Sequence, residues 1–215
     1  MIRVLAFIRR LPGVSRDDFR SHYEDLHVAT ALPSLAGIVG YVRHHLREEI
    51  HGTPDFDCMT RFDYRDADAV RATLARIQGP QGDAIRRDEQ AFMDAPANVF
   101  FAVETAPVWE KTASRTGSTR LLVCVRRPAG EDPARFRARF SDESLPALRA
   151  AVMDARWCLP HWALPGIAQG AGFDAVTELG AAGAGEVAGW ARALEAGGAG
   201  VIAMRVSVHE TRVQG

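Results

Sequence analysis

A histidine near the end of a predicted helix is the residue best suited to acid/base chemistry in this chain. His27 follows Tyr23 by four positions, so both side chains share one face of a helix. A neutral imidazole near pH 7 can accept a proton from a phenol or a carbon acid. The alternative is a helix-end histidine that hydrogen-bonds backbone carbonyls. His22 lies off the face of His27 at helical spacing and is predicted to be a surface residue.

Further candidates for substrate binding lie on predicted strands. His44 could orient a substrate hydroxyl, and Tyr41 could line a pocket for an aromatic molecule. The alternative for His44 is a polar residue at a rim or at a contact between domains, and for Tyr41 a place in the core. Arg61 falls in an apolar strand and therefore needs a partner, either an anionic substrate group or an acid from the other half of the chain.

The composition excludes several classes of function. A net charge of −1 gives no electrostatic footprint for nucleic acid or anionic membranes, and the apolar stretches are strand-sized rather than membrane-spanning. The first residues do not form a signal peptide. Cys58, Cys124 and Cys158 show no CxxC spacing, so we expect no disulfide framework and a reduced, cytoplasmic setting. Phosphate-loop, dinucleotide and zinc-protease motifs do not occur, and the sequence predicts no cofactor and no metal.

An internal repeat organises the chain. Arg9-Arg10 returns as Arg126-Arg127 and Phe56-Asp57 as Phe173-Asp174, each shifted by 117 residues (126 − 9 and 173 − 56). A constant shift predicts two copies of one small fold, which can pack like a symmetric dimer. We assign residues 1–105 and 119–213 to the copies and 106–118 to a linker. The same shift relates three further pairs: Phe19 and Phe136, His44 and His161, Thr60 and Thr177.

Hydrophobic periodicity gives the first copy the order β-α-β-β-α-β, which the ferredoxin-like motif shares. Its predicted elements are strands 2–10, 40–46, 56–64 and 98–104, helices 15–31 and 66–78, and a short helix 83–93. The second copy repeats the order with strands 121–126, 156–162, 173–179 and 201–210 and helices 133–152 and 185–194. It lacks the short helix, and the glycine-rich stretches 180–185 and 197–200 are predicted loops.

The two copies differ at the positions that matter for chemistry. Ser144 corresponds to His27 (144 − 27 = 117), and serine is no base near neutral pH without its own activator. Trp162 replaces His45, which suits the filling of a disused pocket with apolar bulk. We therefore predict one active site, in the first copy. The repeated Asp57 is predicted to serve the fold by binding a chain turn or a strand-one arginine.

The first copy resembles the EthD family of the dimeric α/β-barrel superfamily. The resemblance covers residues 2 to about 105. It rests first on a basic strand end followed by a Pro-Gly turn (Arg9 to Gly13) and on a helix that begins Ser-Arg-acid-acid-Phe-Arg (Ser15 to Arg20). The helix continues to an acid-Leu-His segment (Asp25 to His27). A Gly-Tyr-Val strand (Gly40 to Val42) and an aromatic-Asp pair (Phe56-Asp57) complete the pattern. The family's characteristic histidine corresponds to His27, although the proline that usually follows soon after it comes later here, at Pro33.

The resemblance implies an α+β fold in which two ferredoxin-like sheets close into a barrel, here as a pseudo-dimer within one chain that could pair further as a homodimer. It implies an apolar pocket facing His27 and a cyclic, hydrophobic substrate such as a polyketide intermediate. We expect a cofactor-independent cyclase, dehydratase or monooxygenase. The alternatives are a haem-binding barrel with His44, His45 or His161 as axial ligand, and a carrier of hydrophobic ligands without enzymatic activity.

Overall fold

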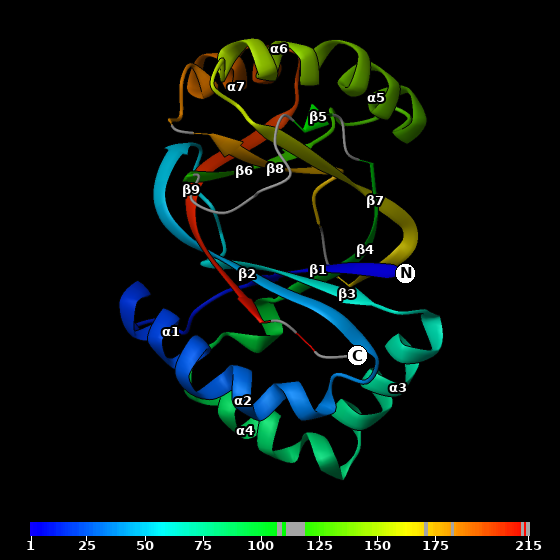
Figure 1. The fold of residues 1–215 in the computed structure, drawn as a ribbon. Coiled ribbons are helices and arrows are strands. Elements are labelled where there is room, and N and C mark those ends of the chain that lie inside the picture. The colour runs from blue at the N-terminus through cyan, green and yellow to red at the C-terminus, as the bar shows by residue number, and fades with distance from the viewer. Residues whose placement is uncertain (107–108, 111–118, 170–171, 182, 212, 214–215) are drawn as a thin grey trace.

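A closed antiparallel β-barrel forms the centre of this computed structural model (Figure 1). The structure describes residues 1–106, 109–110, 119–169, 172–181, 183–211 and 213. Around the barrel the strands follow the order β4-β1-β3-β2-β9-β6-β8-β7, and pairing of β4 with β7 closes it. The strands are β1 (Ile2–Ile8), β2 (Ile38–His51), β3 (Cys58–Tyr64), β4 (Val99–Thr105), β6 (Thr119–Arg126), β7 (Trp157–Gln169), β8 (Ala175–Ala181) and β9 (Gly200–Thr211).

The helices cover the two opposite outer sides of the barrel (Figure 1). Below β1 to β4 lie α1 (Arg16–His22), α2 (Val28–Ala31), α3 (Ala67–Gln78) and α4 (Asp83–Phe92), with a π-helical turn (Tyr23–His27) joining α1 to α2. Above β6 to β9 lie α5 (Pro133–Arg139), α6 (Leu145–Ala151) and α7 (Val187–Ala196), and a second π-helical turn (Phe140–Ser144) joins α5 to α6. Each half therefore buries one face of its strands against helices and the other inside the barrel.

The strand order within each half is the same. In the first half β1 pairs with β3 and β4, and β3 pairs with β2. In the second half β6 pairs with β8 and β9, and β8 pairs with β7. The order agrees with the predicted β-α-β-β-α-β pattern of each copy, and the structure is of the α+β class.

Local signals position the long helix of each half in the same way. Ser15 accepts a hydrogen bond from the backbone of Asp18, and Asp132 accepts one from the backbone of Arg135, so each caps a helix N-terminus. The π-helical turns start at Tyr23 and Phe140, which lie 117 residues apart (140 − 23). Such turns insert one residue into a helix and shift the faces that follow.

The repeated aspartates anchor the start of the third strand of each half. Asp57 accepts hydrogen bonds from the backbone (3.1 Å) and the Nε (3.0 Å) of Arg10. Asp174 accepts from the backbone of Arg127 at 2.9 Å and also pairs with its guanidinium. This contact with an arginine at the end of the first strand is the fold role that the sequence predicted.

Several predicted boundaries were wrong, because strands extend further than their predicted residue ranges, two of them to pair with strands of the other half. β2 and β7 run past the predicted 40–46 and 156–162, because β2 continues along β9 and β7 continues along β4. The predicted loop 180–185 begins inside β8, which extends to Ala181. Within the predicted linker, β5 (Trp109–Glu110) pairs with β7, while 107–108 and 111–118 lie outside the described residues. No helix in the described ranges is both long and apolar enough to span a bilayer.

Candidate functional site

A cavity of about 580 Å³ lies between the sheet of the first half and its helices. Most of the surface of its wall is apolar, which is typical of a site for a small hydrophobic molecule. The wall is formed by Val4, Ile8, Tyr23, His27, Ala31, Leu35, Tyr41, Phe62, Tyr64, Val70, Thr73, Leu74, Ile77, Gln78, Ile85, Glu89, Met93, Asn98, Phe100, Phe101 and Ala102.

His27 is the last residue of the π-helical turn, and its side chain lines this cavity. Its Nδ1 lies 2.7 Å from Oδ2 of Asp88 on α4, and its side chain is only 6% exposed. Among the described residues Nε2 has no hydrogen-bond partner. With Nδ1–H donating to the carboxylate, Nε2 carries the lone pair, which is the tautomer that a general base requires. Burial lowers the pKa of His27, opposed by Asp88, so the ring is neutral at pH 7.

His22 belongs to the same cluster, and its prediction as a plain surface residue was wrong. Its Nε2 lies 2.7 Å from Oδ1 of Asp88, so the two oxygens of one carboxylate hold both His22 and His27. In a regular α-helix residues five apart point in different directions. The π-helical turn has a wider repeat, which brings positions i and i+5 closer to one face. The ring of His22 also stacks on Phe92 at 4.2 Å.

Tyr23 and Tyr41 also line the cavity, as the sequence predicted for pocket aromatics. The hydroxyl of Tyr23 lies 2.9 Å from Oγ1 of Thr60, and its ring meets that of His27 edge to face at 4.9 Å. Burial raises the pKa of both phenols. The two phenols influence each other electrostatically, yet the buried hydroxyl of Tyr41 has no hydrogen-bond partner in the described part of the chain.

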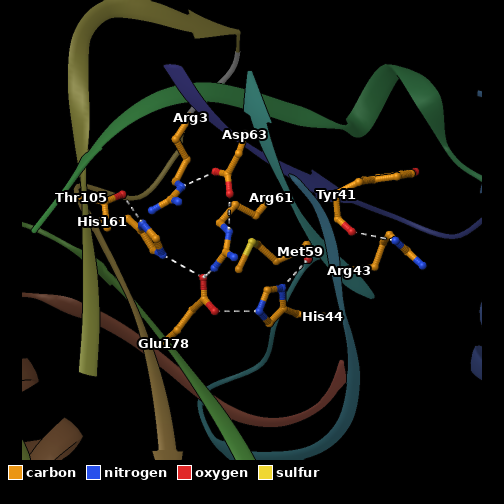
Figure 2. Close-up of polar contacts among 10 residues, drawn as sticks. All are labelled: Arg3, Tyr41, Arg43, His44, Met59, Arg61, Asp63, Thr105, His161 and Glu178. Carbon is orange, nitrogen blue, oxygen red and sulfur yellow. Dashed lines mark hydrogen bonds and ion pairs between the residues drawn. The ribbon is translucent and has the colours of Figure 1, made fainter. Parts of the chain in front are cut away.

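His44 and Arg61 lie elsewhere, on the face of the sheet that points into the barrel (Figure 2). Nη1 of Arg61 donates to Oε1 of Glu178 at 2.6 Å, and Nε2 of His44 lies 2.9 Å from the other carboxylate oxygen. His161 places its Nε2 2.8 Å from Oε1 of Glu178. The partner of Arg61 is therefore an acid from the other half, at the equivalent position of the repeat (178 − 61 = 117).

Glu178 with Arg61, His44 and His161 forms a cluster, here called the Glu178 cluster, which continues across the inside of the barrel (Figure 2). Asp63 pairs with Arg3 and lies 3.5 Å from Nε of Arg61. Thr105 bonds Nδ1 of His161 at 2.7 Å. Burial raises the pKa of Glu178, but Arg61 and the two histidines outweigh burial and hold it well below its ordinary value. Within this cluster the buried acidic and basic side chains pair with one another and link strands of both halves, so we interpret it as a structural contact that stabilises the barrel.

The sequence-predicted site residues thus divide into two groups. His27, Tyr23 and Tyr41 share the cavity, whereas His44 and Arg61 lie in the Glu178 cluster and do not line it. Sequence reasoning missed Asp88 because the second copy has no residue that corresponds to it. In addition, the sequence of its helix is mostly charged, which is typical of a solvent-exposed helix. The available signal was its neighbour Glu89, which interrupts the apolar spacing of Ile85 and Met93.

The corresponding region of the second half is filled by side chains. Phe140 stands in place of Tyr23 and is fully buried against Trp162, at 5.6 Å between ring centroids, and Trp190, at 6.2 Å. Ser144 stands in place of His27, and its backbone carbonyl accepts a hydrogen bond from Trp190 at 2.9 Å. Gly197 to Ala199 alone separate α7 from β9, so the chain has no counterpart of α4 between these two elements.

The strand histidines do not suit haem. His44 and His161 each engage both ring nitrogens, through Glu178 and through Met59 or Thr105. Against the effect of burial, Cys58 and Glu24 raise the pKa of His45 to about 9, and a protonated imidazole has no lone pair for iron. The cavity wall contains no Lys or Arg to meet haem propionates. Among the described residues no group of three or more His, Cys, Asp or Glu is placed to hold a metal ion.

Comparison with known proteins agrees with this fold. Residues 11–96 match the family model of the EthD domain. An anthrone oxidase-like protein superposes with a TM-score of 0.59 at 13% identity, covering 97% of this chain and 92% of its own. A protein from Fusobacterium nucleatum subsp. nucleatum, provisionally assigned as a monooxygenase, gives 0.55 at 9% identity, covering 99% and 95%. A mutant chlorite dismutase from Candidatus Nitrospira defluvii gives 0.53 at 10% identity, covering 96% and 91%.

These identities are low, so the structural similarities show the fold alone. No curated protein matches the chain significantly. Residues 11–96 are therefore similar to the EthD domain, and the chain shares the barrel fold of these solved structures.

Proposed function

We propose that this protein is a cofactor-independent enzyme that acts on an aromatic or polycyclic, polyketide-like molecule, with His27 as the acid/base residue. One observation carries the proposal. His27 lines an apolar cavity of about 580 Å³, its Nδ1 is fixed by Asp88, and its Nε2 has no partner among the described residues. A fixed imidazole with a free lone pair in a mainly apolar pocket is suited to remove a proton from a carbon acid.

The cavity wall favours a cyclic hydrophobic substrate. Phe62, Phe100 and Phe101 supply aromatic surface, and the few polar groups suit an uncharged molecule with ketone or phenol oxygens. Similarity to an anthrone oxidase-like protein, and to one assigned as a monooxygenase, supports a small-molecule enzyme of this kind. Proton removal by His27 would generate a stabilised carbanion, which can then cyclise, eliminate water or react with oxygen. The activity is accordingly a cyclase, dehydratase or monooxygenase.

The two halves are best explained as a tandem duplication in which residues 1–105 keep the active site and 119–213 act as the built-in partner. Their strand orders agree, and their π-helical turns fall 117 residues apart (140 − 23). A trace of the lost site supports this history. In the first half the hydroxyl of Thr60 hydrogen-bonds that of Tyr23. In the second half Phe140 replaces the tyrosine, and the buried hydroxyl of the equivalent Thr177 has no hydrogen-bond partner in the described ranges.

Hydrogen exchange at a ketone tests the base directly. 1-Tetralone is a bicyclic aromatic ketone, and base catalysis replaces its C2 protons by deuterium in D₂O, which NMR follows. We expect the wild-type protein to accelerate this exchange and His27→Ala to lower it by about 10²- to 10⁴-fold. Ser144→Ala changes the equivalent position of the second half and is the matched control, with no expected effect.

Two outcomes would contradict the proposal. Full exchange activity in His27→Ala would show that another group removes the proton. Binding of 1-tetralone without any catalysed exchange would instead identify the cavity as that of a carrier.

A further inference from the structure

The cavity contains a second group suited to proton transfer, supplied by α4. Ile85 and Glu89 lie four residues apart on α4, and Met93 follows directly after the end of this helix; all three lie on the cavity wall. A carboxyl group thus occupies the middle of an apolar stripe. In the described part of the chain this carboxyl has no hydrogen bond and no ion pair. A half-buried acid without a partner is costly for stability and therefore points to a role in the site.

We propose that Glu89 is a catalytic general acid that works with His27, and that the reaction of this cavity is loss of water from a β-hydroxy ketone on a cyclic carbon skeleton. The inference rests on the proposed function and narrows it from three reaction types to one. Oxygenation and simple proton abstraction need only a base, whereas expulsion of hydroxide in a mainly apolar pocket requires an acid at the leaving oxygen.

The electrostatics of the wall favour the proton on Glu89. Burial raises the pKa of its carboxyl, the neighbouring charge of Asp88 raises it further, and Arg86 on the same helix opposes both. The other titratable groups on the wall are His27, Tyr23, Tyr41 and Tyr64, and the tyrosines are neutral because burial raises the pKa of each phenol.

The pair is therefore set up as base and acid. Burial lowers the pKa of His27 below its ordinary 6.5 and raises that of Glu89 above its ordinary 4.5. Two groups whose environments move their pKa values in these directions mark the base and the acid of a site.

The proposed step balances without an oxidant or a reductant. Nε2 of His27 takes the proton from the carbon next to the ketone, and the electron pair of that C–H bond forms the new C=C bond. The C–O bond to the β-hydroxyl breaks as Glu89 gives its proton to the leaving oxygen, which departs as water. The enzyme is left with a protonated His27 and an ionised Glu89, and transfer of one proton between them through solvent restores the starting state.

One helix accounts for the inequality of the two halves. Asp88 orients the base and the next residue, Glu89, is the acid, so α4 supplies both supports of the reaction. The second half lacks α4 and carries Ser144 at the position of His27. Loss of one helix would therefore remove the acid and the orienting carboxylate in a single event.

A dehydration probe tests the acid separately from the base. 3-Hydroxy-1-tetralone is a bicyclic β-hydroxy ketone, and loss of water converts it to fluorescent 1-naphthol. We expect the wild-type protein to catalyse this conversion with a bell-shaped pH profile, and Glu89→Gln to slow it by about 10²- to 10⁴-fold. Asp68→Asn removes an exposed carboxylate from the first turn of α3 and is the matched control, with no expected change.

The exchange of 1-tetralone separates the two proposals, because exchange needs a base and no leaving group. Glu89→Gln should keep exchange within about twofold and lose dehydration. Full dehydration in Glu89→Gln, or exchange by the wild-type protein without dehydration, would overturn the role of Glu89 and leave His27 as base. Loss of exchange in Glu89→Gln would show that Glu89 supports the base rather than acting as an acid. Absence of both reactions in the wild-type protein would overturn both proposals.

Discussion

The Glu178 cluster predicts a large and specific loss of stability on removal of one charge. Glu178 is 1% exposed and bonds Arg61, His44 and His161. Glu178→Gln keeps the size of the side chain but leaves the buried Arg61 guanidinium to share Asp63 with Arg3. Removal of one partner from a buried ion pair costs about 3–5 kcal/mol. In a chain of this length that corresponds to a fall in melting temperature of roughly 6–20 °C.

The pH dependence of this loss follows from the pKa of the same carboxyl. Glu178 has a folded-state pKa well below its ordinary 4.5. Its contribution to the free energy of unfolding is therefore fully present above 4.5 and is lost as the pH falls toward the folded-state value. Urea unfolding followed by tryptophan fluorescence should show a gap of about 3–5 kcal/mol between the wild-type protein and Glu178→Gln near pH 7, which narrows below pH 4.5.

A double variant checks that the loss reflects an unpaired charge. Arg61→Met combined with Glu178→Leu replaces the ion pair by apolar side chains, and such replacements are often neutral or stabilising. We expect the double variant to be more stable than Glu178→Leu alone. A loss of less than about 1 kcal/mol in Glu178→Gln, or a double variant less stable than the single one, would refute the reasoning.

Three other substitutions test the cavity and the repeat. Asp88→Asn removes a carboxylate that raises the pKa of His27. NMR titration should therefore show a lower pKa for His27 than in the wild-type protein, and exchange of 1-tetralone should fall about tenfold or more. An unchanged titration of His27 would contradict this reasoning. Phe140→Tyr offers a hydroxyl to Thr177, and urea unfolding should show a gain of about 1 kcal/mol, whereas a loss of that size would argue against equivalent positions. Gly82→Ala would place a Cβ 1.8 Å from a helix carbonyl, so α4 must shift, and calorimetry should show a loss of about 1–3 kcal/mol together with reduced dehydration.

The repeat made much of the fold predictable from sequence. Residues that hold the same place in both halves follow simple rules of periodicity, capping and turns, so the order of elements and the anchoring role of Asp57 could be predicted. The need of Arg61 for a partner followed from its place in an apolar sheet, and the sequence left open whether that partner is an anionic substrate group or an acid from the other half. The structure identifies that acid as Glu178.

The remaining features depend on geometry that sequence spacing does not carry. The π-helical turn at Tyr23 rotates His22 toward Asp88, and an ordinary helical repeat places it elsewhere. Asp88 and Glu89 belong to a helix without a counterpart, so the comparison of the two copies gave no information about them. The extensions of β2 and β7 follow partners in the opposite half, which become neighbours only in the closed barrel.

The two strand pairs that join the halves also determine how the protein responds to dilution. β2 pairs with β9 and β4 with β7 inside one polypeptide, so barrel closure is an intramolecular event. A barrel assembled from two chains dissociates as its concentration falls, and its apparent stability falls with it. Here the second sheet is present at a fixed effective concentration, set by chain connectivity. The melting temperature of this barrel should therefore be the same at nanomolar and at micromolar protein.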